Sequence, residues 1–294
     1  MIAADTLRRI RKIELRTRKL VNDSLAGAYH SAFKGRGIEF DTIRPYEPGD
    51  DVRLIDWNVT ARTGSPFIKQ YVEERELTVM LMMDASASCL FGSGPLSKRD
   101  YAAEIGSVLA YSAIHNHDKV GLLLFSNRNE LYVPPRKGRN HILRLIRDLL
   151  SAESIESGTN IGAALNMVNR SLKRRSIIFV LSDFLSPVES YADELSLLAH
   201  RHDVIALIVN DEFETTLPDV GIMNVTDAET GQEIWVDTHA PDWLNVFATQ
   251  SVRFRNHVDA VMLHSNVDFV HLNTKTDYLP QLVRLLQQRA RLRR

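Results

Sequence analysis

The sequence predicts an α/β protein with a doubly wound, mostly parallel sheet. From residue 77 onward, short apolar runs alternate with segments of helical periodicity. Two of these runs, ending at residues 83 and 181, are apolar throughout and lie just before the carboxylates Asp84 and Asp183. Continuous apolar runs of this length are typical of strands buried on both faces. Their alternation with helices favours a parallel sheet covered by helices on both sides.

The elements follow in order along this main region. Strands are expected at 77–83, 119–125, 130–133, 176–181, 204–209 and 268–271. Helices are expected at 98–115, 138–150, 160–172, 187–200, 243–263 and 278–292. Pro134 and Pro135 are expected to close the third strand, which reads as an edge strand. Two short alternating runs, 222–225 and 233–236, predict a hairpin.

The first 76 residues have a different character, and we interpret them as an accessory region in front of a main domain at 77–294. Residues 5–22 predict a basic amphipathic helix, whose charges form either a solvated face or a contact with an acidic partner surface. Residues 29–76 are rich in glycine, proline, aromatic and charged residues. They favour short strands and tight turns rather than helices, and their mixed charges favour structural ion pairs.

Composition excludes several classes of protein. A chain of 294 residues with 44% hydrophobic residues can fill a sizeable core, and its formal net charge of -1 creates no general attraction to nucleic acid. A single cysteine, Cys89, excludes a disulfide framework. Charged residues interrupt the N-terminus early, and the apolar runs are too short to span a bilayer. We therefore expect a cytoplasmic protein.

A group of oxygen ligands is predicted at the carboxyl ends of two strands. Asp84, Ser86 and Ser88 alternate directly after the first apolar strand, and Asp183 ends another. Thr159 precedes a helix, where it would ordinarily serve as an N-cap. Loops at the carboxyl ends of parallel strands form the ligand sites of open α/β sheets. Hard oxygen donors there suit a cation such as Mg²⁺ or Mn²⁺.

Two sets of motifs carry a family resemblance. The segments D-A-S-A-S, G-T-N followed by A-A-L, and S-D at a strand end resemble the metal-ion-dependent adhesion site of von Willebrand factor type A (VWA) domains. The longer segments F-K-G-R-G-I-E-F, R-P-Y-E-P-G-D-D-V-R-L-I-D-W-N-V-T-A-R and K-Q-Y-V-E-E-R-E resemble the bacterial domain of unknown function 58 family. One departure is Ser182-Asp183-Phe184, where the third metal motif usually reads T-D-G.

The resemblance implies that Asp84, Ser86, Ser88, Thr159 and Asp183 bind a divalent cation, directly or through water. That cation would be Mg²⁺, or alternatively Mn²⁺ or Ca²⁺, and a carboxylate from a client protein would complete its coordination. Members of the family are commonly associated with MoxR-type AAA+ ATPases. The implied function is a non-enzymatic adaptor that helps such an ATPase remodel or activate client proteins.

Three other functions remain open on the sequence. Asp84 could be the nucleophile of a Mg²⁺-dependent hydrolase or phosphatase, although no phosphate-binding loop or nucleophile-elbow motif accompanies it. The same five oxygens could instead cap helices in a VWA-like scaffold that binds no metal. The basic residues near both termini could bind nucleic acid, which the balanced charge of the rest of the chain disfavours.

Overall fold

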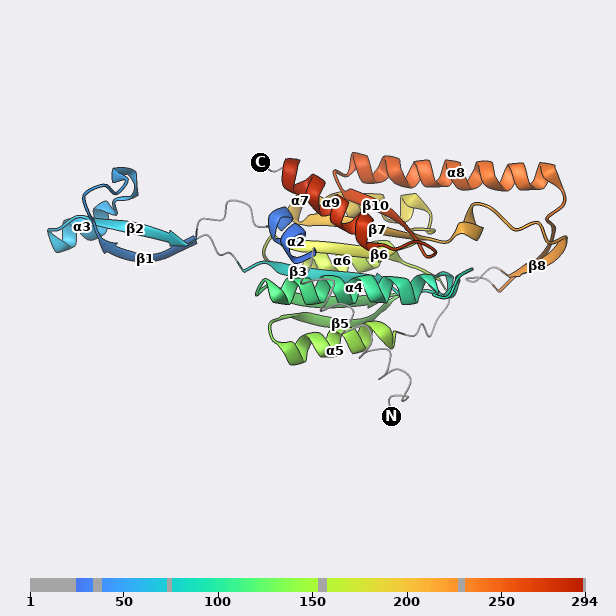
Figure 1. Ribbon diagram of the computed structural model, residues 1–294, viewed down its shortest axis with the longest axis horizontal. Helices are drawn as coiled ribbons and strands as arrows, with labels where there is room; N and C mark the ends of the chain where they lie inside the picture. The colour runs from blue at the N-terminus through green and yellow to red at the C-terminus, as the bar shows by residue number, and fades with distance from the viewer. Residues whose placement is uncertain (1–24, 34–38, 73–75, 153–157, 227–230, 293–294) are drawn as a thin grey trace.

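The computed structural model describes residues 25–33, 39–72, 76–152, 158–226 and 231–292. At the centre of this part of the chain is a six-stranded sheet in the order β10-β7-β6-β3-β4-β5 (Figure 1). Its strands pair in parallel except at the β4–β5 edge, where the pairing is antiparallel. The prediction of an α/β fold with a mostly parallel sheet is therefore confirmed. The strands are β3 (Thr78–Asp84), β4 (Lys119–Phe125), β5 (Asn129–Arg136), β6 (Ile177–Ser182), β7 (Asp203–Asn210) and β10 (Asp268–Asn273).

Helices cover both faces of this sheet and divide the core into two parts. Side chains of β3 alternate between them: Val79 and Leu81 point to one face, and Met80 and Met82 to the other. The first face carries α2 (Ala26–Phe33), α4 (Lys98–His115), α5 (Arg139–Leu150) and α9 (Leu279–Leu292). The second carries α6 (Ile161–Ser171), α7 (Ala192–Arg201) and α8 (Pro241–His264). Burial on both faces explains why β3 and β6 read as continuous apolar runs.

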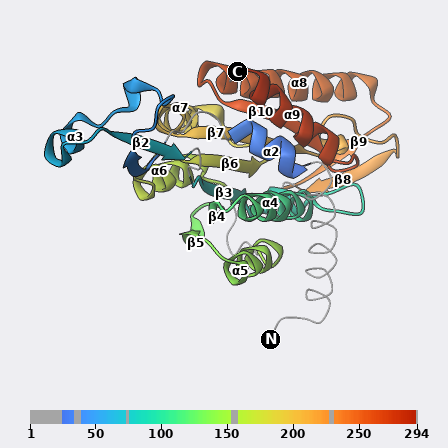
Figure 2. The same cartoon turned by 60° about the vertical axis from the view of Figure 1, so that its left-hand side comes forward.

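The accessory region forms an antiparallel hairpin that projects from one end of the molecule (Figures 1 and 2). Strands β1 (Glu39–Pro45) and β2 (Phe67–Val72) enclose a 3-10 turn, η2 (Val52–Leu54), and a helix, α3 (Trp57–Thr63). The expectation of strands and turns rather than helices was wrong for α3 and for residues 29–33, which belong to helix α2. Asp56 caps the N-terminus of α3 by accepting hydrogen bonds from the backbone of Asn58 and Val59, and Gly64 ends α3 with a φ of 74°. The expected ion pairing includes a two-point contact of Arg44 with Asp50.

Helix α2 packs with the main sheet although it precedes the hairpin in sequence. Its Tyr29 and Phe33 are buried against the same core as α4 and α9, and the Tyr29 hydroxyl donates to Asp118 at 3.2 Å. The predicted basic helix at 5–22 lies outside the described residues. The proposed division of the chain after residue 76 stays a prediction.

Strand β5, at one side of the main sheet, is longer than expected. Strand β5 continues through Pro134 and Pro135 to Arg136 instead of ending before them. An edge strand tolerates this because it has a neighbour on one side only, so the missing amide hydrogens break few ladder bonds.

The predicted hairpin is present as β8 (Ile222–Thr226) and β9 (Glu233–Asp237). None of the described helices combines the length and apolar character that a membrane crossing requires.

Candidate metal centre

Asp84 lies at the end of the central strand β3 and is almost completely buried, with 1% of its surface exposed. Its Oδ1 accepts a hydrogen bond from the Ser86 backbone N–H at 2.9 Å, and its Oδ2 accepts one from Ser182 Oγ at 2.6 Å. Burial, followed by repulsion from the nearby Asp183, raises the pKa of Asp84 to about 7, although these hydrogen bonds oppose the rise. A cation beside this carboxylate would offset both causes of the shift.

The two predicted serine ligands follow β3 directly: Ser86 precedes a short 3-10 turn, η3 (Ala87–Leu90), and Ser88 lies within it. Ser86 Oγ and Ser88 Oγ lie 3.1 Å apart, and both side chains are buried. Cys89 in the same turn has its Sγ 3.8 Å from Ser86 Oγ and 3.9 Å from Asp183 Oδ2. Burial is the main cause that raises the pKa of this thiol, so Cys89 is an uncharged neighbour of the oxygen ligands.

Asp183 comes from the loop after β6, the parallel neighbour of β3. Pairing of these two strands brings Asp84 and Asp183 to the same edge of the sheet, as the sequence pattern predicted. The next residue, Phe184, has a φ of 55°, in the left-handed region that glycine adopts most readily. This conformation explains why glycine is usual at the position. Here Phe184 keeps the turn and buries its ring against Tyr191, with the ring centroids 5.7 Å apart.

Thr159 lies at the same edge, in the loop before α6. The neighbouring Asn160 N–H donates to the carbonyl of Ser126, which follows β4, at 2.8 Å. The Thr159 carbonyl accepts a hydrogen bond from Ser186 Oγ at 3.4 Å, which holds this loop against the segment that follows Asp183. The structure thus brings the loops of all five predicted ligands to one sheet edge, with Thr159 at its more exposed side.

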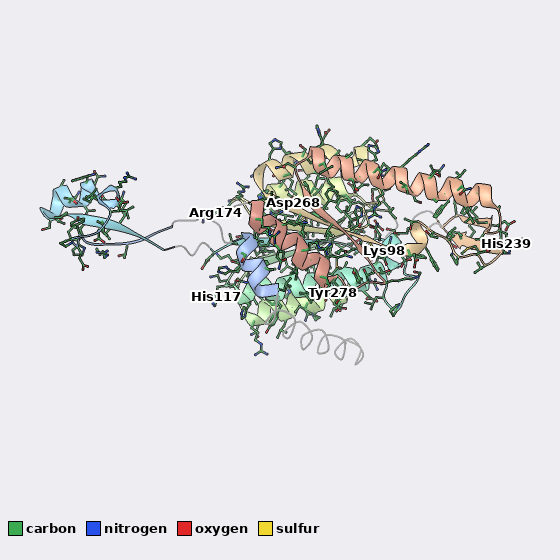
Figure 3. All side chains as sticks on the ribbon, turned by 45° about the horizontal axis from the view of Figure 1, so that its top comes forward. Lys98, His117, Arg174, His239, Asp268 and Tyr278 are labelled. Carbon is green, nitrogen blue, oxygen red and sulfur yellow. The ribbon has the colours of Figure 1, made fainter. Side chains whose placement is uncertain are left out.

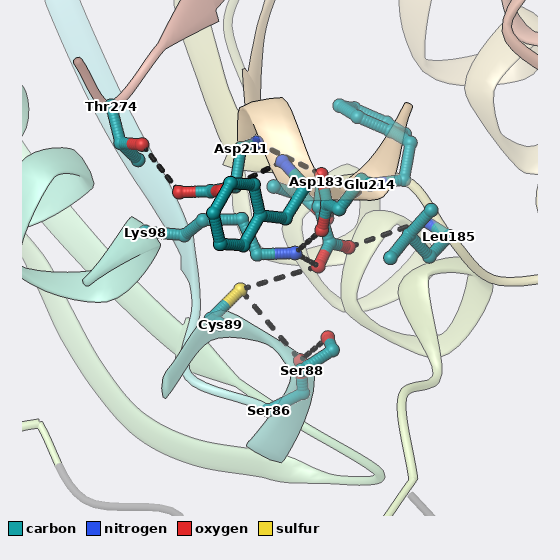
Figure 4. A network of polar contacts seen from close by, with 12 residues as sticks. Ser86, Ser88, Cys89, Lys98, Asp183, Leu185, Asp211, Glu214 and Thr274 are labelled. Atoms are coloured by element: carbon teal, nitrogen blue, oxygen red, sulfur yellow. Dashed lines mark hydrogen bonds and ion pairs between the residues drawn. The ribbon is translucent and has the colours of Figure 1, made fainter. Parts of the chain in front are cut away.

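A buried lysine that the sequence did not single out lies among these groups. Lys98, the first residue of α4, is labelled in Figure 3 and is 1% exposed. Its Nζ lies 2.7 Å from Asp183 Oδ2 (Figure 4). The same ammonium contacts Glu214, which belongs to the short turn η5 (Glu212–Glu214) after β7. Burial alone would lower the pKa of Lys98, but attraction to the two carboxylates outweighs it and raises that pKa.

A second buried carboxylate fixes the turn that carries Glu214. Asp211 is 1% exposed and accepts hydrogen bonds from the Ser93 N–H at 2.9 Å, the Phe213 N–H at 3.0 Å and Thr274 Oγ1 at 2.7 Å. Its own backbone N–H donates to Glu214 Oε2 at 2.9 Å. Asp211 therefore joins three loops around the candidate centre, as Figure 4 shows for Thr274.

The chemistry of these donors fits a divalent cation. An oxygen of Asp84, the sulfur of Cys89 and an oxygen of Asp183 all lie within 4.8 Å of one another, and the residues are buried. Two carboxylates and two serine hydroxyls are the hard ligands that Mg²⁺ or Mn²⁺ prefers. The cluster could therefore hold a metal ion, with the hydroxyls of Ser86 and Ser88 as additional donors.

Comparison with known proteins agrees with this architecture. The model of the family described as "Protein of unknown function DUF58" matches residues 42–257. The chain belongs to the DUF58 family. A relative of this DUF58 protein, the uncharacterized protein Rv1480 of Mycobacterium tuberculosis strain H37Rv, is 32% identical over 286 residues, covering 96% of this chain and 89% of that one.

Solved structures resemble this DUF58 protein in fold. The conserved hypothetical protein BatB of Bacteroides thetaiotaomicron aligns with a TM-score of 0.50 at 17% identity, covering 73% of this chain and 99% of that one. The VWA domain of SpRpn10 aligns with a TM-score of 0.40 at 14% identity, covering 71% of this chain and 94% of that one. The order of its mostly parallel sheet, with the antiparallel edge strand β5, agrees with the expected α/β fold class.

Proposed function

We propose that this DUF58 protein is a divalent-metal-dependent protein-binding adaptor and that it catalyses no reaction. The observation that carries the proposal is the convergence of Asp84, Asp183, Ser86 and Ser88 at one edge of the sheet. Two anionic ligands leave a divalent ion with unneutralised positive charge and a strong attraction for a further carboxylate. We propose Mg²⁺ as the ion, with Mn²⁺ or Ca²⁺ as alternatives, and an acidic side chain of a client protein as the additional ligand.

The immediate surroundings of the centre support a protein as the ligand. Leu90 and Phe91, which follow the serine ligands, are 50% and 44% exposed, and Leu185, which follows the Asp183–Phe184 turn, is 44% exposed. Exposed apolar side chains beside a charged centre suit a macromolecular surface, since protein interfaces bury apolar groups around a few polar contacts.

A MoxR-type AAA+ ATPase is the partner that the family resemblance suggests. In this proposal, ATP hydrolysis belongs to the partner, and the chain described here selects the client. No covalent step is required of Asp84, and its burial and two hydrogen bonds disfavour a role as a nucleophile that must reach a substrate.

A metal-free scaffold is the second candidate, and one specific observation favours it. The Lys98 ammonium already supplies positive charge to Asp183, so the carboxylates at this edge are partly neutralised without an added ion. In that case the same edge would bind its partners through surface contacts alone.

The deciding experiment combines a binding assay with a stability assay. Client proteins from a host lysate, with the host's MoxR-type ATPase as a second readout, are captured on immobilised wild type, Asp84→Asn, Asp183→Asn and the control Glu189→Gln, each with Mg²⁺ and with chelator. Glu189 is an exposed carboxylate in the short 3-10 turn η4 (Val188–Ser190) before α7, and it suits a matched control. In parallel, thermal unfolding of each protein is followed as Mg²⁺ is added, since an ion that binds only the folded state stabilises it.

We expect a client protein to be captured by the wild type and by Glu189→Gln in Mg²⁺, with loss in chelator and in both aspartate variants. At a Mg²⁺ concentration about 100 times Kd, stabilisation of about 2.7 kcal/mol is expected for the two metal-binding proteins. Equal capture under all conditions without any shift in unfolding temperature would refute the metal dependence and favour the scaffold. Metal-dependent turnover of a phosphoester that is lost in Asp84→Asn would instead establish an enzyme.

A further inference from the structure

The buried Lys98 ammonium contacts Asp183, a carboxylate that the proposed divalent metal would also bind. Its Nζ lies 2.7 Å from Oδ2 of Asp183, and the Lys98 side chain is 1% exposed. A buried ammonium is costly to desolvate unless carboxylates surround it, and here Asp183 and Glu214 do so. The lysine therefore depends on Asp183, which is also one of the two predicted anionic metal ligands.

Apart from Asp183 Oδ2, which contacts Lys98, the carboxylate oxygens of Asp84 and Asp183 accept hydrogen bonds from neutral donors. Asp183 Oδ1 accepts from the Leu185 N–H at 3.2 Å, while Asp84 accepts from the Ser86 N–H and from Ser182 Oγ. Each carboxylate is thus hydrogen-bonded at both oxygens in the structure. Asp183 Oδ2, the oxygen nearest Cys89 Sγ, is the one that holds the ammonium.

We propose that Lys98 is an internal cation that competes with the divalent metal for Asp183 and thereby sets the metal affinity of the site. This inference rests on the metal dependence proposed above. When no ion is bound, the ammonium neutralises Asp183 and holds it close to Glu214. When a divalent ion binds, it repels the ammonium, so Lys98 lowers the affinity for the ion.

Glu214 decides how strongly Lys98 competes. It shares the ammonium with Asp183, and its η5 turn is held by Asp211. Removing the Glu214 charge leaves the ammonium with Asp183 as its remaining anionic contact among the described ion pairs, which strengthens the competition. Removing the Lys98 charge ends the competition. The two substitutions are therefore expected to change metal affinity in opposite directions, which a purely structural lysine would not predict.

The test measures Mg²⁺ binding by isothermal titration calorimetry to purified full-length protein. The variants are Lys98→Met, Glu214→Gln and the double variant Lys98→Met/Glu214→Gln, which leaves one buried carboxylate fewer without its cation than Lys98→Met alone and is therefore expected to fold more readily. Lys275→Met is the matched control, because Lys275 forms an exposed pair with Glu212 in the same loop region. Circular dichroism and thermal unfolding verify that each variant is folded.

Lys98→Met and the double variant are expected to bind Mg²⁺ about tenfold or more tightly than the wild type. Glu214→Gln is expected to bind more weakly, and Lys275→Met to match the wild type. A wild type that binds Mg²⁺ as tightly as the double variant, or more tightly, overturns the competition while leaving the metal-dependent function intact. Absence of Mg²⁺ binding in the wild type and in every folded variant overturns both proposals. Binding by the double variant when the wild type shows none supports the competition directly.

Discussion

Replacing Asp211 with alanine should destabilise the edge of the sheet that carries the candidate centre. The buried carboxylate accepts three hydrogen bonds, from Ser93, Phe213 and Thr274, which come from three separate loops. A hydrogen bond to a charged group contributes about 1.5–3 kcal/mol, but the three bonds share one side chain and are not additive. We expect Asp211→Ala to lower the free energy of unfolding by about 3 kcal/mol.

The lowered pKa of Asp211 gives the pH-dependent part of this stabilisation. Burial alone would raise this pKa, but the hydrogen bonds from Ser93, Thr274 and Phe213 outweigh burial and lower it from 3.8 to about 2. A lowered pKa means that the folded state favours the carboxylate, so the contribution is fully present above about pH 4 and is lost as the pH falls toward 2. After allowance for solvent screening, the shift corresponds to about 1–2 kcal/mol.

Urea denaturation at pH 7 and at a series of values between pH 4 and pH 2 measures both effects. Asp211→Asn keeps an oxygen acceptor without the charge, so it should cost less than alanine and flatten the pH dependence in this window. Asp219→Ala is a suitable control, because that carboxylate is 71% exposed. An Asp211→Ala protein within about 1 kcal/mol of the wild type would refute the reasoning that this carboxylate joins the loops.

Further substitutions test other parts of the fold, each by chemical denaturation unless stated. Phe184→Gly should be more stable than Phe184→Ala by about 1 kcal/mol, because only glycine adopts the φ of 55° without strain. Both variants lose a buried ring, which costs about 3–5 kcal/mol. The reverse order of stability would contradict the assigned turn. Gly162→Ala should cost about 2 kcal/mol or more, since its Cβ would lie 2.4 Å from the Ser190 carbonyl, whereas Gly27→Ala, with nothing within 4 Å, should be neutral or stabilising. Tyr29→Phe should lower the free energy of unfolding by about 1 kcal/mol, because it removes the hydrogen bond to Asp118. The rate of amide hydrogen exchange in α2 should rise as well. An unchanged rate would mean that this hydrogen bond does not hold α2 on the core.

The sequence predicted the main sheet well because its strands are buried on both faces. The apolar runs of β3 and β6 and the carboxylates after them made it possible to predict that Asp84 and Asp183 lie at one edge. These are local patterns, in which a strand and its end can be recognised from consecutive residues. Whether all five predicted residues bind a metal stays a prediction.

Features that depend on distant contacts could not be predicted in the same way. Lys98 reads as an ordinary first-turn helix residue, and its partners Asp183 and Glu214 are 85 and 116 residues away. Its burial results from loops that meet only in the folded chain. The helix α3, by contrast, had a local signal in Asp56 and Gly64, which flank it as caps. The charged and aromatic character of the surrounding segment obscured that signal.

The packing of α2 also bears on how the chain folds. Helix α2 precedes the sheet in sequence but lies against α9, near the other end of the chain, and the Arg289 guanidinium lies 5.5 Å from the centre of the Phe33 ring. During synthesis, the contact of Phe33 with Arg289 therefore forms only after α9 has been synthesised. Such distant pairing slows folding, because a long loop must close before the contact is made. We therefore expect α2 to dock late, after the central strands have formed, so its amides should gain protection from hydrogen exchange after those of β3 and β6 during refolding.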